Sequence, residues 1–299
     1  MPTIIIDTDI GTNADDAIAI ALAARSPEIS IKGITTVYGN VKIRAAITNQ
    51  VLRLAGKENI PIYQGIEQPL LREREVFWAG FEGEGLQLGD YIHKKDKHAV
   101  QFIIDMIMNN PGEITLVTIG PLTNIATALI IEPKIAENVK EIIMMAGVTR
   151  LGVNRLNLEP IEHNIKCDPE AASIVFRSGA PITMVGLDVT RQVFISRLEI
   201  EKMVTCNTPL ANLLSMMMET HMNYLKRDYA YLSDPITVSL LLDRSIVKTK
   251  QMEITIENEG RSKFAYTIGT PSKTGNVAVS LEIDRQKFLK ILNERVFSS

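Results

Sequence analysis

Residues 3–17 read TIIIDTDIGTNADDA, and this order of residues is typical of a strand, a polar turn and a helix. The apolar run Thr3–Ile6 is short and bounded by polar residues, as in strands that are buried on both faces of a sheet. Asp15–Ala24 places two carboxylates before a run of apolar residues, and negative charge is favourable at the start of a helix. We therefore expect a buried strand that leads through an acidic turn into a helix.

The same alternation continues along the chain. Further apolar runs are predicted as strands at Ile31–Thr36, Ile114–Ile119, Glu141–Met145 and Ile182–Val185. Helices are predicted over Ala45–Ala55, Ala99–Met108, Asn124–Ile131 and Asp284–Val296, and alternating residues predict strands within Val247–Ile268. Strands that alternate with helices are typical of βαβ units. The expected fold class is therefore α/β, with a mainly parallel open sheet flanked by helices and a Rossmann-like core.

The composition favours a globular protein that acts on a small molecule. The chain has 299 residues and a formal net charge of -3, without the concentrated Lys and Arg that nucleic acids or anionic membranes require. No apolar run approaches the length that crosses a bilayer, and we expect no signal peptide. Cys167 and Cys206 are too few for a disulfide framework, which favours a cytoplasmic location. Because no convincing linker divides the chain, residues 1–299 are expected to form a single domain.

Polar residues follow several of the predicted strands. Residues 7–16, 38–40 and 118–121 each come directly after an apolar run. Ligands of open parallel sheets bind beyond the carboxyl ends of the strands, so we expect these segments to share one site. Leu70–Gly89, rich in glycine and charge, is predicted to be a long loop of the kind that covers an active site. A second irregular stretch is expected at Thr149–Ile161.

The carboxylates of residues 7–16 predict a cation site or a catalytic site. Crowded carboxylates repel one another and raise one another's pKa unless a cation or hydrogen-bond donors neutralise them. An all-oxygen set without His or Cys suits Ca²⁺ or Mg²⁺ better than Zn²⁺. These residues alone leave two other interpretations open. Asp15 and Asp16 could cap a helix while Asp7 and Asp9 stabilise a turn, or Asp7 could be the nucleophile of a magnesium-dependent phosphohydrolase of the haloacid-dehalogenase type.

Five motifs, in the same order, resemble the nucleoside hydrolase family of the inosine-uridine preferring type, and they extend over almost the whole chain. They are residues 7–11 with Asp15-Asp16-Ala17, Val37 to Asn40, Thr118 to Asn124, Glu162 to Ile165 with Asp168 to Ala172, and Ser233-Asp234-Pro235. The resemblance implies hydrolysis of the N-glycosidic bond of a purine or pyrimidine ribonucleoside to ribose and free base, in nucleoside salvage. It also implies a nucleoside hydrolase-like fold and a homodimer or homotetramer.

The resemblance implies a role for each matching polar residue. The ligands of a Ca²⁺ ion would be Asp9, Asp16, the backbone carbonyl of Thr118 and Asp234. Asp9 would also be the general base, because a carboxylate beside a metal-activated water is within reach of its proton. The ribose hydroxyls would be bound by Asp15, Asn40, Glu162 and Asn164.

Three features depart from the pattern of the family. Ser233 stands where members specialised for inosine and uridine have a His that protonates the leaving base, and Phe81-Glu82 stand near an expected His-Gly pair. Two extra residues lie between Gly11 and the paired aspartates. The leaving base could instead be activated by Tyr229, Tyr231, Arg227 or stacking on Trp78. The alternative to an enzyme is therefore a protein of the same fold that binds ribose or a nucleoside without turnover.

No catalytic role is expected for the histidines and cysteines. His163 is expected either to touch the substrate or to hydrogen-bond a neighbouring segment. We expect His93, His98 and His221 to be solvated surface groups. Neither Cys167 nor Cys206 has a catalytic partner nearby in sequence, so both are expected to be inert.

Overall fold

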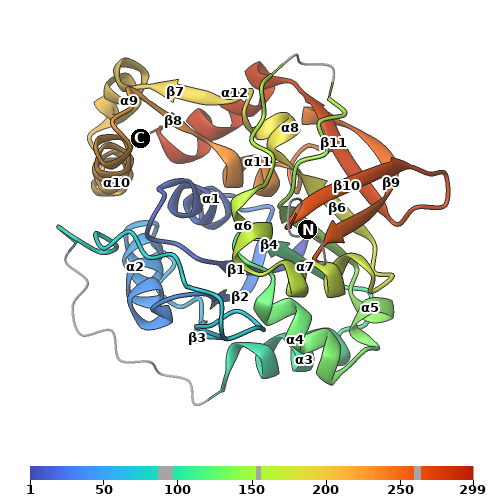
Figure 1. Cartoon of the computed structure of the whole chain (residues 1–299). Helices are drawn as coiled ribbons and strands as arrows, with labels where there is room; N and C mark the ends of the chain where they lie inside the picture. The colour runs from blue at the N-terminus through green and yellow to red at the C-terminus, as the bar shows by residue number, and fades with distance from the viewer. Residues whose placement is uncertain (87–96, 153–155, 259–263, 299) are drawn as a thin grey trace.

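A nine-stranded sheet runs through the middle of the protein (Figure 1). The computed structural model describes residues 1–86, 97–152, 156–258 and 264–298, and the strand order is β10-β9-β11-β6-β5-β4-β1-β2-β3. These strands are β1 (Thr3–Thr8), β2 (Ser30–Thr36), β3 (Ile62–Gln64), β4 (Ile114–Thr118), β5 (Glu141–Met145), β6 (Ile182–Val185), β9 (Val247–Glu257), β10 (Tyr266–Pro271) and β11 (Val277–Ile283). β9 is antiparallel to β10 and β11, whereas the other neighbours in this sheet are parallel. The predicted α/β class with a mainly parallel open sheet is confirmed.

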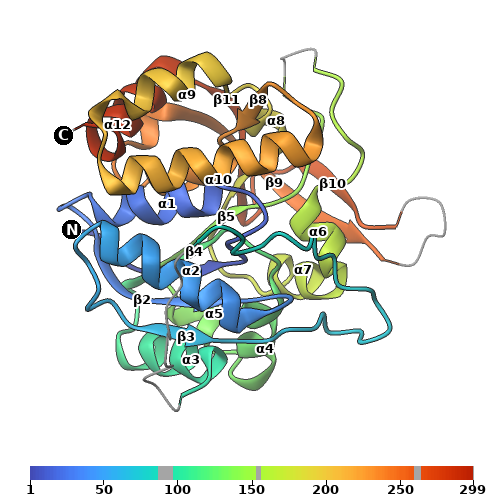
Figure 2. The ribbon, with the colours of Figure 1, turned by 90° about the vertical axis from the view of Figure 1, so that its left-hand side faces the viewer.

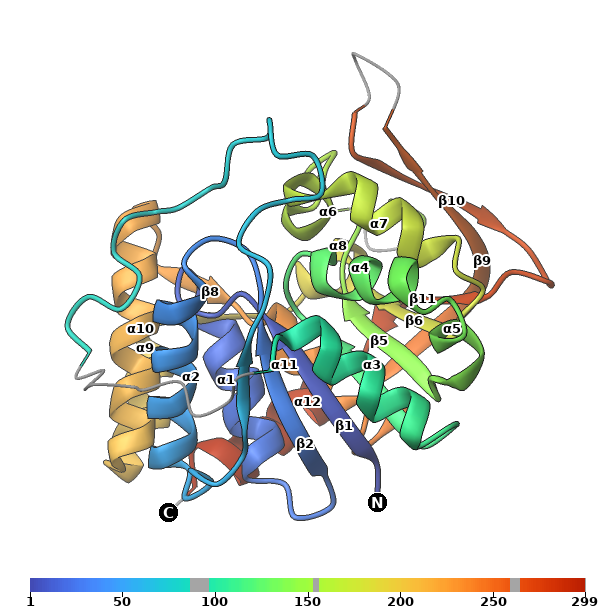
Figure 3. The same cartoon turned by 90° about the horizontal axis from the view of Figure 1, so that it is seen from below.

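Helices lie on both faces of the sheet (Figure 3), and the alternating side chains of β1 divide the core between these faces. Ile4 and Ile6 belong to one apolar cluster, whereas Ile5 belongs to the other. The first cluster includes residues of α1 (Asp15–Ala24), α2 (Val41–Leu54), α10 (Pro209–Leu225), α11 (Ser233–Ser239) and α12 (Arg285–Val296). The second includes residues of α3 (Ala99–Asn109), α4 (Thr123–Ile131), α5 (Ile135–Asn138) and α7 (Pro169–Phe176). Both faces of β1 are therefore covered, which explains its unbroken apolar sequence.

Shorter elements surround these layers. They are α6 (His163–Cys167), α8 (Leu187–Thr190), α9 (Arg197–Met203), the 3-10 turns η1 (Val204–Cys206) and η2 (Arg244–Ile246), and a two-stranded sheet of β7 (Phe194–Ser196) and β8 (Tyr229–Tyr231). Figure 2 shows α10 lying beside α1, so that residues far apart in the sequence approach the start of α1. Within the described residues, no helix has the length and apolar character needed to span a bilayer.

The predicted elements are present in the structure, with one shifted boundary, and several short elements and one longer strand were not predicted. α2 begins at Val41 rather than Ala45, because the Asn40 side chain caps it by accepting a hydrogen bond from the Ile43 nitrogen. β11 was not predicted; it pairs with β6 on one side and β9 on the other, and these tertiary contacts stabilise it. Residues 70–86 contain no helix or strand, as expected, and the last part of the predicted loop, 87–89, lies outside the described residues.

Candidate functional site

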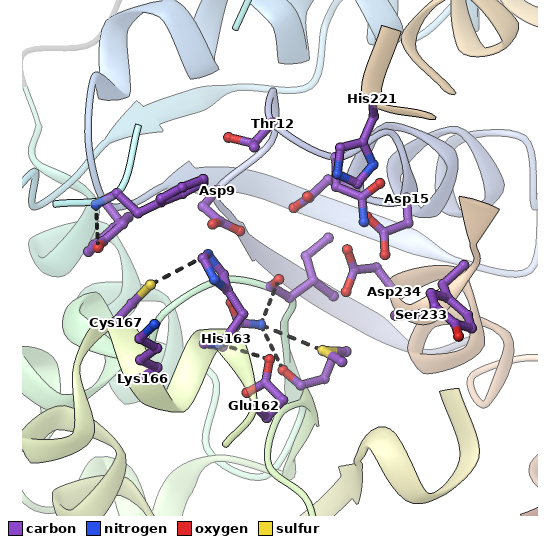
Figure 4. A pocket seen from close by; sticks show the side chains of 18 of the residues that line it. Asp9, Thr12, Asp15, Glu162, His163, Lys166, Cys167, His221, Ser233 and Asp234 are labelled. Carbon is purple, nitrogen blue, oxygen red and sulfur yellow. Dashed lines mark hydrogen bonds between the residues drawn. The ribbon is translucent and has the colours of Figure 1, made fainter. Parts of the chain in front are cut away.

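A cavity of about 820 Å³ opens at the carboxyl ends of the central strands (Figure 4). Asp9 follows β1, Tyr38 follows β2, Ile119 follows β4 and Met145 ends β5, and all of them line the cavity. The three polar segments that were expected to share one site therefore meet here. They meet because parallel strands bring their carboxyl ends to the same edge of a sheet.

Three carboxylates form a buried cluster on one side of this cavity. Asp15 and Asp16 begin α1, and Asp234 lies in the first turn of α11, which packs against α1. One carboxylate oxygen of each residue lies within 4.8 Å of those of the other two, and each residue is 4% exposed. Asp9 is half-buried, and Figure 4 shows it facing the same space as Asp15 and Asp234. Which of these oxygens contact a metal and which contact ribose stays a prediction.

Burial makes the ionised forms of these carboxylates costly. Removal from water raises the pKa of Asp15 to about 6 and the pKa values of Asp16 and Asp234 well above the usual range. Repulsion from the charge of Asp9 contributes to the raised pKa of all three carboxyl groups. A cation between these oxygens would offset both effects, and an all-oxygen donor set fits a hard divalent ion. The residues present therefore fit a metal site.

Two side chains that sequence reasoning missed support this cluster. The Thr8 hydroxyl donates a hydrogen bond of 2.5 Å to Asp16 Oδ1. Arg44, which is 1% exposed, donates from Nε to the carbonyl oxygen of Tyr38 at 2.5 Å and from Nη1 to the carbonyl oxygen of Asp9. Thr8 lies on the same face of β1 as the buried residues Ile4 and Ile6. Arg44 lies on the buried face of α2. That periodicity is the signal that could have identified both.

Thr8→Val is expected to weaken binding of a divalent ion at this cluster by about ten- to hundredfold, the usual cost of losing a residue that orients a metal ligand. The substitution keeps the shape of the side chain but removes the donor that holds Asp16. Calorimetric titration of the metal-free protein with calcium chloride measures the effect. Thr127→Val, which removes a hydroxyl that bonds only within α4, is the control and should bind Ca²⁺ like the wild type. Equal affinities of the two variants would show that Thr8 does not orient Asp16.

Asp9 and Thr118 come together because β1 and β4 are adjacent and parallel. Thr118 is fully buried, and its hydroxyl has no hydrogen-bond partner among the described residues. Beyond it, a Cβ atom at Gly120 would lie 2.8 Å from the nitrogen of Asp9 and 2.9 Å from its Oδ1. Gly120 therefore permits the loop after β4 to approach Asp9 closely. A ligand role for the Thr118 carbonyl stays a prediction.

Glu162 and Asn164 line the cavity from the start of α6. Glu162 caps this helix, since its carboxylate accepts hydrogen bonds from the backbone nitrogens of Asn164 and Ile165. The Asn164 amide donates to the carbonyl oxygens of Ile119 and Met145, at 3.2 and 3.0 Å. These bonds fix the orientation of two side chains that were predicted to bind ribose.

Asn40, the remaining residue that was predicted to bind ribose, is placed differently. Its side chain is exposed, its Oδ1 caps α2, and it does not line the cavity. The neighbouring Tyr38 does line the cavity, and it adopts a positive φ of 63°. Contact between Asn40 and a ribose therefore stays a prediction.

A second group of polar side chains in the cavity comes from α10 and the segment after it. His221, Arg227 and Tyr231 all line the cavity. The Arg227 guanidinium carbon lies 5.3 and 5.7 Å from the ring centres of Tyr229 and Tyr231. Among the described residues, Arg227 Nε is buried without a hydrogen-bond partner. This part of the cavity therefore offers hydrogen-bond donors to a ligand.

The prediction that His221 is a solvated surface group is wrong. His221 is half-buried on α10, where helical spacing turns it toward the cavity. Burial and, to a smaller extent, the charge of Arg227 lower its pKa to about 4, so the imidazole is neutral at neutral pH. His98 is exposed as expected and caps α3, whereas His93 lies outside the described residues.

The residues at the positions that depart from the expected family pattern differ in whether they line the cavity. Ser233 is 5% exposed and lines the cavity next to Asp234. Trp78, from the long loop, lines it as well, and the Arg44 guanidinium carbon lies 5.1 Å from its ring centre. Phe81 and Glu82 do not line the cavity. Neither therefore stands where a side chain could contact a ligand in this arrangement.

Cys167 and His163 lie at the edge of the cavity near Glu162 (Figure 4). The Cys167 Sγ atom is 3.5 Å from His163 Nε2, and the His163 ring meets the Phe77 ring edge-on at 5.6 Å. Burial raises the pKa of the Cys167 thiol to about 12, so it stays protonated at neutral pH. A protonated thiol is a weak nucleophile, which agrees with the expectation that Cys167 is inert.

Comparison with known proteins gives consistent results. The family model described as "Inosine-uridine preferring nucleoside hydrolase" matches residues 4–290. The pyrimidine-specific ribonucleoside hydrolase RihB of Escherichia coli is 33% identical over 98% of this chain and 96% of that protein. The solved structure of a plant nucleoside hydrolase has a TM-score of 0.87 at 30% identity, covering 100% of this chain and 99% of that one. The purine-preferring ribonucleoside hydrolase from Gardnerella vaginalis has a TM-score of 0.86 at 30% identity, covering 98% of both chains.

The match extends from β1 to α12 and includes every segment that lines the acidic side of the cavity. Agreement in sequence, in fold and in a buried acidic cluster leaves no place for the phosphohydrolase interpretation of the N-terminal motif. The chain belongs to the inosine-uridine preferring nucleoside hydrolase family and is thus an enzyme of the ribonucleoside hydrolase class.

Proposed function

We propose that this enzyme hydrolyses the N-glycosidic bond of ribonucleosides with Ca²⁺ held by its acidic cluster and Asp9 as the general base. The meeting of Asp15, Asp16 and Asp234, with carboxylate oxygens within 4.8 Å of one another, is the observation that carries the proposal. Asp9, Asp16, Asp234 and the carbonyl of Thr118 would hold the ion. Ca²⁺ takes roughly six to eight oxygen ligands in flexible geometry, which suits a site that must also bind ribose hydroxyls.

When bound, the ion supplies a positive charge that lowers the pKa of a water molecule and attracts the ribose hydroxyls. The residues of the chain carry out the remaining steps. Asp9 accepts a proton from the water as the water oxygen bonds to C1′ of the ribose, and the bond from C1′ to the base nitrogen breaks. Nearby carboxylates stabilise the positive charge that develops on the ribose ring. Glu162 and Asn164, already oriented by backbone hydrogen bonds, position the sugar.

The leaving base takes the electron pair of the broken bond and therefore needs a proton or a hydrogen-bond donor. The Ser233 hydroxyl is a poor acid, so this requirement falls on other residues of the cavity. Arg227, Tyr231 and His221 line the same space, and Arg227 Nε has no other partner among the described residues. We assign the base to this side of the cavity, with Arg227 as a donor that stabilises its developing negative charge.

Arg227→Met is expected to lower kcat for a purine or pyrimidine ribonucleoside by about 10- to 100-fold. The same variant should hydrolyse 4-nitrophenyl riboside within about twofold of the wild-type rate, because 4-nitrophenolate is a stable anion that leaves without a proton. Absorbance of the released phenolate and a reducing-sugar assay measure the two reactions. Arg177→Met, at an exposed position after α7, is the control. An equal loss on both substrates would show that Arg227 does not act on the base.

The reaction itself is tested by incubating the protein with purine and pyrimidine ribonucleosides and following free ribose, in Ca²⁺ and in chelator. We expect ribose release in Ca²⁺ that stops in chelator. Tight nucleoside binding without release would identify a binding protein instead. The panel also determines the preferred base, which differs between RihB, named pyrimidine-specific, and the purine-preferring enzyme of Gardnerella vaginalis. The homodimer or homotetramer stays a prediction, which light scattering can test.

A further inference from the structure

The turn after Gly11 and the long loop that contains Glu82, two of the places where the sequence departs from the expected family pattern, meet in one hydrogen bond. Thr12 Oγ1 donates to Glu82 Oε1 at 2.6 Å. This bond joins the turn that leads into α1 to the loop between β3 and α3. Glu82 is only 7% exposed, whereas Glu84 in the same loop is exposed. A carboxylate is buried in this way only when its oxygens are paired.

Glu82 also organises the loop around itself. Its Oε1 accepts a second hydrogen bond from the Ala79 nitrogen and its Oε2 accepts one from the Gly80 nitrogen, both at 2.8 Å. Burial opposes ionisation, but these bonds and the one from Thr12 hold the pKa of Glu82 below its usual range. Gly80 and Gly83 have positive φ values of 93° and 83°, which other residues rarely adopt. The ionised carboxylate therefore stabilises a loop shape that depends on specific hydrogen bonds.

Residues 77–82 of the long loop also contact both sides of the cavity. A Cβ atom at Gly11 would lie 3.5 Å from Glu82 Cβ and Cγ, so Glu82 rests directly on the turn after β1. The Phe81 ring centre is 4.9 Å from that of Tyr224 on α10. At the other end of the stretch, the hydroxyl of Tyr38 accepts a hydrogen bond from the Phe77 nitrogen at 2.9 Å. Figure 3 shows the loop, in teal, passing across to α10.

We propose that Glu82 and Thr12 form a latch that holds Phe77 and Trp78 at the cavity before substrate arrives. Phe77, Trp78 and Thr12 line the cavity and Glu82 does not, so Glu82 is a positioning residue, and the Trp78 fluorescence of Thr12→Val separates loop order from a direct contact of Thr12 with substrate. A loop that is already ordered adds no ordering cost to substrate binding. Without the latch, only a fraction of the free enzyme has the binding-competent loop, and the apparent affinity falls by that fraction. Thr12 in the turn and Glu82 in the loop thus act together through one hydrogen bond.

Steady-state kinetics of Thr12→Val and Glu82→Ala test this inference. We expect KM to rise about five- to twentyfold in both variants, the loss that a charge-assisted hydrogen bond produces, with kcat changed by less than about twofold. The double variant should be no worse than Glu82→Ala alone, because each substitution breaks the same bond. Thr12→Ser keeps the hydroxyl and should recover most of the wild-type KM. Glu84→Ala removes an exposed carboxylate of the same loop and is the matched control.

Trp78 fluorescence gives a readout that requires no turnover, so the inference can be tested even if the proposed reaction fails. Trp78 is the single Trp of the chain, is half-buried, and lies over Gly39 and Arg44. In Thr12→Val and Glu82→Ala without substrate, its emission should shift to longer wavelength and acrylamide quenching should rise about twofold, as expected for a more exposed indole. Thr12→Ser and Glu84→Ala should resemble the wild type.

Wild-type fluorescence and KM in Thr12→Val would overturn the latch. A fall in kcat equal to the rise in KM would also overturn it, because that result assigns Thr12 or Glu82 to the reaction itself. Circular dichroism and thermal unfolding verify that each variant is folded. If Glu82→Ala does not fold, the comparison of Thr12→Val with Thr12→Ser decides the matter, since the first variant replaces only the hydroxyl by a methyl group and the second removes only the methyl group.

Discussion

Asp9→Asn is expected to lower kcat for a ribonucleoside by about 10³- to 10⁴-fold, the upper range for loss of a general base. Asn keeps the size of the side chain and an oxygen that can face a cation, but it cannot accept a proton from water at neutral pH. KM should change far less than kcat, because the residues assigned to ribose and base are untouched. The measurement is ribose release at saturating Ca²⁺ and saturating nucleoside.

Although Asp9→Asn should lower activity, it is not expected to lower the stability of the protein. Burial is the main reason that the pKa values of Asp15, Asp16 and Asp234 are raised, and the Asp9 charge adds to it. Removing that charge relieves repulsion, so the metal-free Asp9→Asn protein should unfold at the same or a higher temperature than the wild type. Asp105→Asn, on the exposed side of α3, is the control for both measurements. Activity within about tenfold of the wild type would exclude Asp9 as the base.

Asp234→Asn is expected to weaken Ca²⁺ binding by about 10²- to 10³-fold, since it removes one charge from a cluster of three and leaves the others buried. In the wild type, excess Ca²⁺ should raise the unfolding temperature, because a ligand that binds only the folded state stabilises it. That increase should be absent in Asp234→Asn at the same Ca²⁺ concentration. Thermal unfolding in Ca²⁺ and in chelator measures the difference.

Asp228→Asn provides the matched control for Asp234→Asn. The Asp228 side chain is 97% exposed and lies six positions before Asp234, so its loss should leave the Ca²⁺-dependent increase unchanged. If Asp234→Asn instead binds Ca²⁺ as tightly as the wild type, the acidic cluster is not the cation site. Restoring activity in chelator-treated wild type with Ca²⁺ but not with Zn²⁺ would support an oxygen-ligand site for a hard ion.

The order of elements could be predicted from the sequence because strands buried on both faces leave a local signature. Thr3–Ile6 and Ile182–Val185 are short apolar runs, and both are strands of the parallel sheet. β11 was missed because it is less completely buried than the central strands and Ser280 and Glu282 interrupt its apolar residues. Its place between β9 and β6 is decided by long-range pairing, which a local pattern does not contain.

The acidic character of the site was visible in residues 7–16, whereas Asp234 was assigned to it only through the resemblance to the family. Asp15 and Asp16 lie more than 200 positions before Asp234, and only the packing of α1 against α11 brings these carboxylates within 4.8 Å. The burial of Arg44 was not predicted, although Arg44 lies on the buried face of α2, because a charged residue near a helix start is ordinarily solvated. The exposed cap position of Asn40 likewise appeared only in the folded chain.

The sequence by itself determined the α/β class, the position of the acidic turn after β1 and the chemistry of its oxygens, since strand burial and ligand type depend on local pattern and residue identity. Tertiary structure alone decided which residues meet. It joined Asp234 to Asp15 and Asp16, brought His221 and Arg227 into the cavity, and paired Thr12 with Glu82. The physical reason is that carboxylate clustering, cavity lining and loop hydrogen bonds are set by the packing of elements that are distant along the chain, and side-chain periodicity reports only the face that each element buries.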